Sequence, residues 1–344
     1  FDEFPNYPRQ ADYTYPNLNV ALFGENIIYL NDKLSITPGA RFEYIKTESD
    51  GFYTRINTDG AGNIIFKETI FDDDIKERSF VLLGLGASYK PNKNLEVYGN
   101  ISQNYRSITF SDISIFNPAY TINPNIDDEK GFTSDIGLRG SYRRLLSYDL
   151  SVFGLSYKDR IGFIQKVQED GRVVSERGNV GNAFIYGIES LINFNLGEVL
   201  LKSKDYNFSY YLNSSFITSE YTESLESGIV GNKVEFVPEV NIKTGFRFGY
   251  KNFLSTVQYT YLSEQFTDAS NAVSGSLSGV IGKIPSYNVL DFSVSYRYKI
   301  LKLEAGVNNL LNKAYFTRRA TGYPGPGIIP SPPRNWYTTL EIRL

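Results

Sequence analysis

The 344-residue sequence contains no cysteine, no histidine and no methionine, and it has a single tryptophan. Without cysteine there is neither a disulfide framework nor a thiolate metal site. Without histidine the chain lacks the commonest side-chain ligand of zinc, copper and haem iron, and also the commonest general base. These absences close most hydrolase and metalloenzyme mechanisms, so we expect no enzyme, no metal site and no cofactor.

Long apolar runs and an excess of basic charge are also missing. A helix that spans a membrane needs about 18 uninterrupted apolar residues. The longest candidate here, the run from Val81 to Tyr89, is broken by Gly84 and Gly86. A helical membrane protein is therefore excluded. The net charge of −3 gives no positive field to hold nucleic-acid phosphates, so no nucleic-acid partner is expected.

The chain is instead rich in aromatic residues and in alternation of apolar with polar side chains. Aromatic residues make up 15% of the sequence, with 27 tyrosines and 24 phenylalanines, which favours strands. In the run 287–300, Phe292 and Val294 fall on one face of an extended strand, and Asp291 and Arg297 fall on the other. The sequence therefore predicts strands with one apolar and one polar face.

Reading every such run gives about thirteen strands. Their predicted spans are 18–30, 34–47, 77–90, 95–105, 131–143, 147–163, 183–196, 207–221, 237–250, 253–265, 286–299, 302–316 and 334–344. The connections alternate between tight turns and long loops. The turns are at 31–33, 91–94, 143–146, 251–252 and 300–301, with a longer one at 197–206, and the loops are at 48–76, 106–130, 164–182, 222–236, 266–285 and 317–333.

Short turns at one end and long loops at the other are typical of an outer-membrane barrel, so we predict an all-β fold, a transmembrane antiparallel β-barrel. The turns would lie in the periplasm and the loops outside the cell. A soluble β-sandwich or propeller is the alternative, but the strand lengths and the order of connections argue against it. Single-chain bacterial barrels have an even number of strands, so an odd count indicates that strands precede this chain.

Two sets of side chains follow from this prediction. Tyr29, Tyr89, Phe253 and Tyr298 lie near strand ends and are expected in the aromatic girdle that contacts outer-membrane lipid. Charged residues on the opposite face are expected to line the lumen. They are Arg41, Glu43, Asp135, Arg139, Arg247, Asp291, Arg297, Glu341 and Arg343.

Four segments resemble those of a known family. The run 306–315, Gly-Val-Asn-Asn-Leu-Leu-Asn-Lys-Ala-Tyr, resembles the closing signature of TonB-dependent outer-membrane receptors. The segment 123–130 is similar to that family's Asn-Pro-x-Leu-Lys-Pro-Glu segment, with two aspartates in place of Lys and Pro. The segments 104–112 and 315–328 resemble stretches of the ferric citrate type receptors, although Ser107 stands where proline is usual.

This resemblance implies a signal peptide, an N-terminal plug domain and about nine earlier strands of a barrel of about 22, all preceding residue 1. Residues 1–344 would then be the C-terminal part of the barrel, in the bacterial outer membrane. The implied partners are a TonB-type energy transducer, which acts through the absent plug, and an imported ligand. The chain departs from the family pattern at its end, because Leu344 replaces the usual aromatic residue.

The last long loop holds the first candidates for ligand binding. Arg318 and Arg319 offer fixed, bidentate donors suited to planar carboxylates, and the resemblance implies that this loop contacts ligand. A solvated loop, or contact with lipopolysaccharide phosphates, is the alternative. Tyr323 lies in the Gly- and Pro-rich run 322–327, whose backbone kinks suit a loop that folds over the mouth or a stiff surface turn.

Further candidates lie in two other predicted outer segments. Arg106 and Gln103 are placed where a strand leaves the membrane at the outer mouth, a natural position for donors that face a ligand. An ion pair of Arg106 with Asp112 or with a neighbouring strand is the alternative. Arg172 and Arg177 would complete an anion site, although an exposed hairpin tip explains them more simply.

The expected function is active import of an iron chelate, such as a siderophore or, as the best single candidate, ferric citrate. The last-loop resemblance and the arginines, which suit a tricarboxylate, both support citrate. The alternatives are an importer of a glycan or another nutrient, paired with a surface lipoprotein, a passive porin, and an outer-membrane lipase or protease. The absence of histidine argues against the usual Ser-His-acid arrangement in the last of these.

Overall fold

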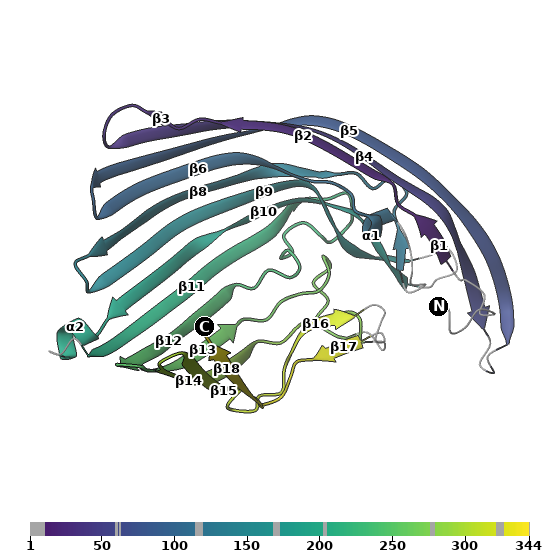
Figure 1. Cartoon of the computed structure of the whole chain (residues 1–344). Helices are drawn as coiled ribbons and strands as arrows, with labels where there is room; N and C mark the ends of the chain where they lie inside the picture. Colours follow the sequence, from purple (N-terminus) through teal and green to yellow (C-terminus); the bar gives the residue numbers. More distant parts are fainter. Residues whose placement is uncertain are drawn as a thin grey trace.

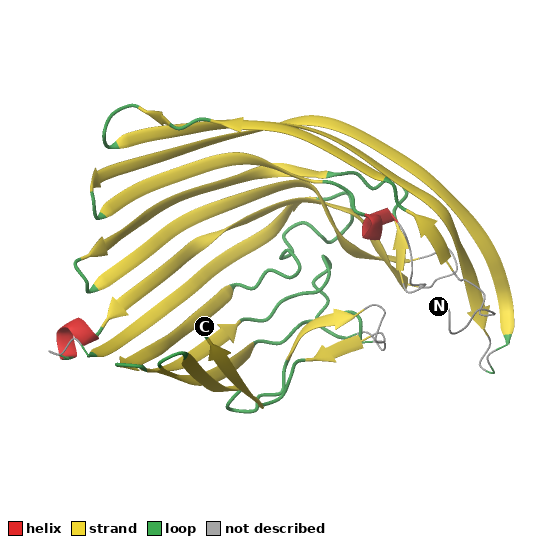
Figure 2. Ribbon diagram, viewed as in Figure 1, coloured by secondary structure: helices red, strands yellow, loops and turns green. Residues whose placement is uncertain are grey.

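The computed structural model describes residues 11–58, 61, 63–113, 120–167, 173–201, 205–275, 279–320 and 327–343. In these ranges the chain is built of β-strands, with two helices of one turn, α1 (Phe110–Ile113) and α2 (Gly197–Leu200). No helix in the same ranges is long and apolar enough to cross a membrane. The strands form a large antiparallel sheet that curves around a hollow side (Figures 1 and 2).

The large sheet contains 16 strands in the order β1-β4-β5-β6-β8-β9-β10-β11-β12-β13-β14-β15-β18, while β2, β3 and β7 lie off this path. β1 (Ala11–Thr14), β2 (Asn17–Glu25) and β3 (Ile28–Tyr29) pair in turn along β4 (Leu34–Thr58). They are three pieces of one ribbon. Counted in this way, and with the short parallel strand β7 set aside, the sheet has thirteen ribbons, and the predicted all-β, antiparallel fold is confirmed.

The remaining strands follow in chain order. They are β5 (Ile64–Asn92), β6 (Leu95–Arg106), β7 (Tyr120–Ile122), β8 (Glu129–Tyr142), β9 (Leu146–Val167), β10 (Val173–Asn195), β11 (Tyr206–Glu223), β12 (Val240–Tyr250), β13 (Phe253–Leu262), β14 (Tyr287–Tyr298), β15 (Leu301–Asn308), β16 (Phe316–Ala320), β17 (Gly327–Pro330) and β18 (Asn335–Ile342). β16 and β17 form a separate two-stranded hairpin.

The loops predicted at 48–76 and 164–182 are wrong. β4 and β5 remain paired as far as Thr58 and Ile64, and β9 and β10 remain paired as far as Val167 and Val173. These strands contain 25, 29, 22 and 23 residues, whereas a membrane crossing needs about 9–11. The sequence of these extensions lacks the clear apolar–polar alternation that reveals a strand, and on β9 and β10 the inner face is covered by other connections.

The strand predicted over 302–316 also ends early, at Asn308. The next residue, Asn309, is buried and has a φ of 52°. Its backbone N–H donates to Oδ1 of Asp291 at 2.8 Å, and its side-chain oxygen accepts the backbone N–H of Lys313 at 2.8 Å. The segment that resembles the family's closing signature therefore folds as a compact turn around one buried asparagine.

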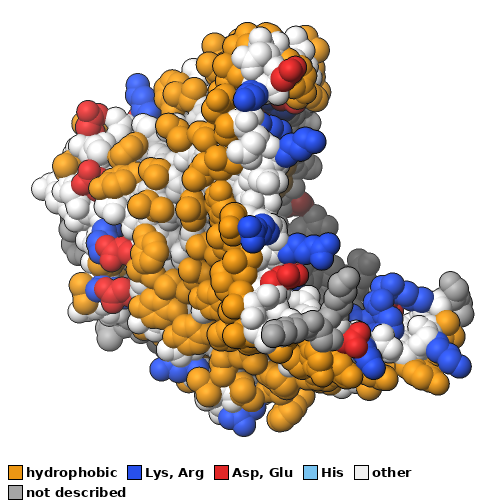
Figure 3. Space-filling view, turned by 90° about the vertical axis from the view of Figure 1, so that its left-hand side faces the viewer, with side chains coloured by type: hydrophobic (Ala, Val, Ile, Leu, Met, Phe, Trp, Pro, Cys, Tyr) orange, Lys and Arg blue, Asp and Glu red, His pale blue; other side chains and the backbone are white. Residues whose placement is uncertain are grey.

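The outward face of the sheet is apolar. Ile136, Val152 and Ile188 are direct neighbours across β8, β9 and β10, and they are 69%, 58% and 55% exposed. Figure 3 shows a broad hydrophobic surface on the molecule. Several of the predicted inward charges form pairs on the other face, for example Arg41 with Glu43 at 2.6 Å. A sheet with these two faces fits a wall between lipid and a lumen.

The inner wall is not polar throughout. Near the loop end, the connection 224–239 and the segment 263–275 fold onto the inner face of β9 and β10. The backbone N–H of Ala269 donates to the carbonyl oxygen of Phe163 at 3.2 Å, and Asn232 donates to the carbonyl oxygen of Ala269 at 2.9 Å. The buried cluster beneath consists of Ile164, Val180, Ala183, Ile185, Tyr221, Ile229, Val234 and Ala269.

Four glycines of the inner face lie directly opposite an aromatic residue on the neighbouring strand. The pairs are Gly137 with Tyr98, Gly187 with Phe153, Gly245 with Tyr211, and Gly306 with Tyr337. A Cβ added to Gly137 would lie 2.2 Å from Cζ of Tyr98, so the ring lies against the glycine itself. The Tyr98 hydroxyl donates to Asp149 at 2.8 Å, which fixes the ring in this place.

Substitution of Gly137 by alanine tests this packing. We expect Gly137→Ala to lower the free energy of unfolding by about 1–3 kcal/mol, because the Tyr98 ring must leave its position. The control is Gly86→Ala, whose Cβ would meet its neighbours at an ordinary 3.7 Å. Urea unfolding of the full-length receptor, reconstituted in lipid vesicles, measures both. Equal stability of Gly137→Ala and the parent protein would contradict the packing argument.

Candidate functional site

A hollow of about 470 Å³ lies on the inner face at the loop end of β6, β8, β9 and β10. We call it the mouth hollow. Its charged lining consists of Arg106, Glu129, Arg160, Arg177 and Glu235. Arg106 and Arg177, which the sequence predicts as ligand residues, come from strands that are far apart in the chain, and the fold brings them to the same hollow.

Arg106 and Arg177 converge on one carboxylate, that of Asp112 in α1, whose side chain is fully buried. Nη2 of Arg106 lies 3.1 Å from Oδ2, and Arg177 donates to Oδ1. Thr109 adds its backbone N–H at 2.8 Å and its hydroxyl at 2.7 Å. Burial alone would raise the pKa of Asp112, but the Thr109 hydrogen bonds and the two guanidinium groups outweigh it and hold the pKa below its ordinary value.

Glu129 and Glu235 are two further buried carboxylates, and each has an arginine partner. Glu129 accepts a hydrogen bond from Nη1 of Arg106 at 2.8 Å and another from a backbone N–H of β9. Glu235, in the β11–β12 connection, lies 3.4 Å from Nη2 of Arg160 and accepts the hydroxyl of Tyr221 at 2.7 Å. The Glu235 contacts attach a second connection to the mouth hollow.

A fourth buried carboxylate, Asp128, closes the seam where β5 and β6 separate. Its Oδ2 lies 3.1 Å from Nε of Arg78 on β5, and it accepts hydrogen bonds from the Tyr105 hydroxyl and from the backbone N–H of Ile108. The ring of Tyr105 stacks on Phe80 at 3.7 Å between centroids. Four arginines and four carboxylates thus form one balanced arrangement, which we call the mouth network: Arg78, Arg106, Arg160, Arg177, Asp112, Asp128, Glu129 and Glu235.

The described parts of the β6–β8 connection are bonded to strands on both sides. β7 pairs in parallel with residues 175–177 of β10. Asn179 of β10 donates to the carbonyl oxygen of Asp127 at 2.8 Å, and Lys76 of β5 donates to that of Ile126 at 2.9 Å. The connection therefore bridges the inner side of the mouth from β5 to β10.

Gln103 does not line the mouth hollow. It is three residues from Arg106 in the same strand and so points to the other face of the wall. Its partner across the ladder is Phe132, which is half exposed on the outward face. Its Oε1 accepts the backbone N–H of Leu83 at 2.9 Å, next to the last β5–β6 pair. This placement gives no support to the predicted ligand contact.

Arg318 and Arg319 point to opposite faces of β16. Arg319 donates to the carbonyl oxygens of Gly279 and Lys283, both at 2.7 Å, and burial lowers the pKa of its guanidinium. It therefore attaches the β16–β17 hairpin to the β13–β14 connection. Arg318 is exposed. Neither arginine lines the mouth hollow.

The structure thus brings together two of the predicted ligand residues, Arg106 and Arg177, and leaves Arg318 apart from them. Tyr323 and Arg172 lie outside the described residues. For Arg106, the structure contains the ion pair that stands as the alternative to ligand contact. No motif in the sequence marks the other members of the mouth network. An acidic residue in each outer connection is the available signal, but it does not reveal which arginine each carboxylate meets.

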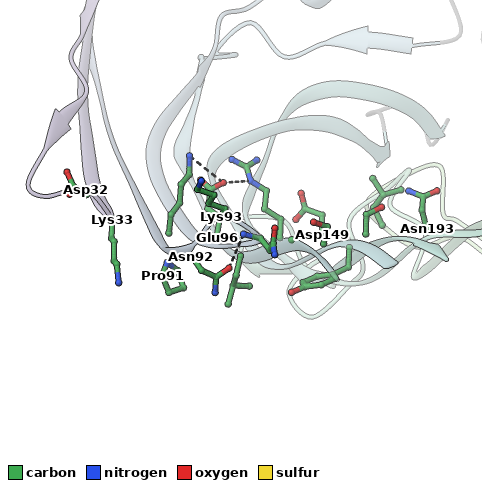
Figure 4. A pocket seen from close by; sticks show the side chains of 17 residues that line it. Asp32, Lys33, Pro91, Asn92, Lys93, Glu96, Asp149 and Asn193 are labelled. Carbon is green, nitrogen blue, oxygen red and sulfur yellow. Dashed lines mark hydrogen bonds and ion pairs between the residues drawn. The ribbon is translucent and has the colours of Figure 1, made fainter. Parts of the chain in front are cut away.

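A second hollow, of about 740 Å³, lies on the inner face at the short-turn end (Figure 4). Glu96 accepts a hydrogen bond from Nε of Arg139 at 2.9 Å and lies 4.0 Å from Nζ of Lys90. Asp149 accepts the hydroxyl of Tyr98, over whose ring the Arg139 guanidinium lies at 5.0 Å. These inward charges satisfy one another, and none of the predicted ligand residues lines this hollow, whereas Arg106 and Arg177 line the mouth hollow, which is therefore the stronger candidate for ligand binding.

Comparison with known proteins gives a consistent result. Residues 2–310 match the family model described as TonB dependent receptor-like, beta-barrel. The ferric citrate transporter FecA, in its unliganded form, superposes with a TM-score of 0.74 at 21% identity, over 98% of this chain and 47% of that chain. For the ferric yersiniabactin uptake receptor FyuA from Yersinia pestis, the TM-score is 0.70 at 17% identity, over 96% of this chain and 46% of that chain.

The copper transporter OprC superposes with a TM-score of 0.70 at 16% identity, over 95% of this chain and 48% of that chain. At these identities the likeness concerns the fold, and the chain spans about half the length of each solved protein that it matches. The family model, by contrast, covers most of the sequence. Together with the thirteen antiparallel ribbons and their apolar outward face, it shows that this chain belongs to the β-barrel family of TonB-dependent receptors.

Proposed function

We propose that residues 1–344 form the C-terminal part of the barrel of an outer-membrane receptor that imports an iron chelate. The favoured ligand is rich in carboxylates, as ferric citrate is. Family membership supports a receptor for a scarce nutrient. The observation that carries the ligand class is the convergence of two guanidinium groups, from β6 and β10, on one carboxylate at the mouth.

A ligand carboxylate binds this site by exchange. Arg106 and Arg177 already hold Asp112, so an added anion that replaces this carboxylate keeps both guanidinium groups paired, while the Asp112 carboxylate is released to water. The side chain of Arg106 is 37% exposed and is within reach of a molecule in the hollow. Release of Asp112 detaches α1 from the wall, which couples ligand binding to movement of the β6–β8 connection.

The receptor needs parts that lie outside this chain. A plug domain would close the lumen, and a TonB-type energy transducer would pull on it to let the ligand pass. The barrel catalyses no reaction in this scheme. Outer-membrane lipid and lipopolysaccharide surround it. A surface lipoprotein belongs to the alternative in which the ligand is a glycan.

Uptake of radioactive iron tests the proposal. Cells that lack other routes for ferric citrate should accumulate iron from it when they produce the full-length receptor, and collapse of the proton-motive force should abolish the uptake. Uptake that persists without energy would indicate a passive porin. If iron uptake does not depend on the receptor while growth on a polysaccharide does, the iron proposal is wrong.

Replacement of Asp112 tests the exchange. Asp112→Asn removes the competing charge, so the affinity for ferric citrate should rise about tenfold, whereas Arg177→Gln should lower it by about as much, since one hydrogen bond to a charged group contributes about 1.5–3 kcal/mol. Calorimetry on the purified full-length receptor measures both. Glu96→Gln, in the hollow at the short-turn end, is the control and should leave the affinity unchanged. Weaker binding by Asp112→Asn would rule out exchange.

Arg318 is retained as a proposed first contact, because its guanidinium is exposed on the β16–β17 hairpin. A charge at the rim of a site affects the association rate more than the dissociation rate. Arg318→Gln should therefore slow association about two- to threefold at low salt, and screening should remove the difference at about 1 M salt. Stopped-flow measurements of ligand binding give the rates. An unchanged association rate at low salt would remove Arg318 from the site.

A further inference from the structure

Three of the short turns begin in the same way, with a tyrosine followed by a cation. The pairs are Tyr142–Arg143, Tyr250–Lys251 and Tyr298–Lys299, at the ends of β8, β12 and β14. In each pair the cationic residue has a positive φ, of 52°, 50° and 52°. The mouth network and the proposed uptake make no use of these six residues.

The left-handed backbone conformation is unusual for lysine and arginine. It costs an ordinary residue about 1–2 kcal/mol, whereas glycine and asparagine adopt it more readily. This chain uses asparagine in that conformation at Asn309 and Asn312. Lysine or arginine in three equivalent turns therefore indicates that the charged side chain itself has a role.

The three tyrosines face outward. Tyr142 continues the row of alternate positions that contains Ile136, and Tyr250 continues the one that contains Phe246. All three rings are between 37% and 57% exposed. They occupy the last outward position of each strand, where the apolar surface ends. An aromatic ring in this place lies at the level of the lipid headgroups.

Each cation lies over the ring that precedes it. The distance from the charged group to the ring centroid is 5.4 Å for Arg143, 5.2 Å for Lys251 and 5.5 Å for Lys299. The positive charge is thereby held on the outward side of the wall. Lys90 and Arg139, at the same end of the sheet, lie inward beside Glu96 instead. Figure 3 views the molecule from the side of the short turns, and it shows Lys and Arg side chains spaced among hydrophobic ones.

Backbone hydrogen bonds fix the positions of these turns. The N–H of Lys251 donates to the carbonyl oxygen of Asp205 at 3.0 Å, and the carbonyl oxygens of Leu145 and Ile300 accept bonds from the neighbouring ribbons at 2.7 and 2.9 Å. Each of the three turns is therefore bonded to the chain beside it. The backbone that carries each cation is therefore held in place, so it needs little ordering when the cation binds a ligand.

We propose that these three tyrosine–cation pairs bind the phosphate groups of anionic phospholipids in the leaflet that meets the short turns. A ring at headgroup depth and a positive charge fixed on its outer side are together complementary to a lipid phosphate above an acyl chain. The apolar outward surface accommodates the chains of the same lipids. The inference rests on the membrane barrel and is independent of which ligand is imported.

Spin-labelled lipids test the inference. The full-length receptor is reconstituted in phosphatidylcholine vesicles with a trace of labelled phosphatidylglycerol or labelled phosphatidylcholine, and electron spin resonance gives the relative association constant. Phosphatidylglycerol should be favoured about fivefold at these sites, because a Lys or Arg near an anionic headgroup contributes about 1 kcal/mol. The triple variant Arg143→Asn, Lys251→Asn, Lys299→Asn should bind both lipids equally, and asparagine retains the turn conformation.

The matched control removes three cations of the inner hollow at the same end, Lys33→Asn, Lys90→Asn and Lys93→Asn, and should keep the selectivity. Equal binding of the two lipids by the parent receptor would overturn the inference. So would an equal loss in the control, because net charge would then explain the effect. Iron uptake by the Arg143, Lys251 and Lys299 triple variant should be unchanged, so failure of this inference is distinguishable from failure of the proposed function.

Discussion

Lipid on one side of the wall is the constraint on which the rest of the structure depends. Backbone N–H and C=O groups must pair within the sheet, and the side chains that meet lipid are mostly apolar, as in the row Ile136, Val152 and Ile188. The polar and charged side chains that lipid disfavours therefore lie mostly on the inner face. It holds most of the ion pairs, the rings that pack on glycine and the folded connections.

At the mouth, the connections cover the inner wall and remove its charged side chains from water, which is unfavourable for an unpaired charge. A buried charge persists there because it has a partner, and the mouth network provides one for each of Asp112, Asp128, Glu129 and Glu235. The same pairing limits what the site can accept. A guanidinium group that is already satisfied favours a ligand that resembles its present partner, which is a carboxylate.

Much of the fold could be predicted because lipid imposes a period of two on every crossing strand. The paired extensions of β4–β5 and β9–β10 could not, since their sequences do not alternate clearly, and the connections that cover the inner face of β9 and β10 come from distant parts of the chain. In the site, Asp112 follows Arg106 by six positions, so an ion pair between them could be proposed from the sequence. Arg177 reaches the same carboxylate because β7 pairs with β10, a contact that no local pattern encodes. The face of Gln103 could have been deduced from its odd spacing to Arg106.

The β6–β8 connection has a geometric consequence for the mouth. It is bonded to β5 on one side and to β10 on the other, and three strands lie between them in the sheet. It is thus a chord drawn across an arc. A connection held at both ends limits how far the part of the wall from β5 to β10 can flatten. Release of these bonds would change the curvature of the wall at the loop end, while the short-turn end kept its own curvature.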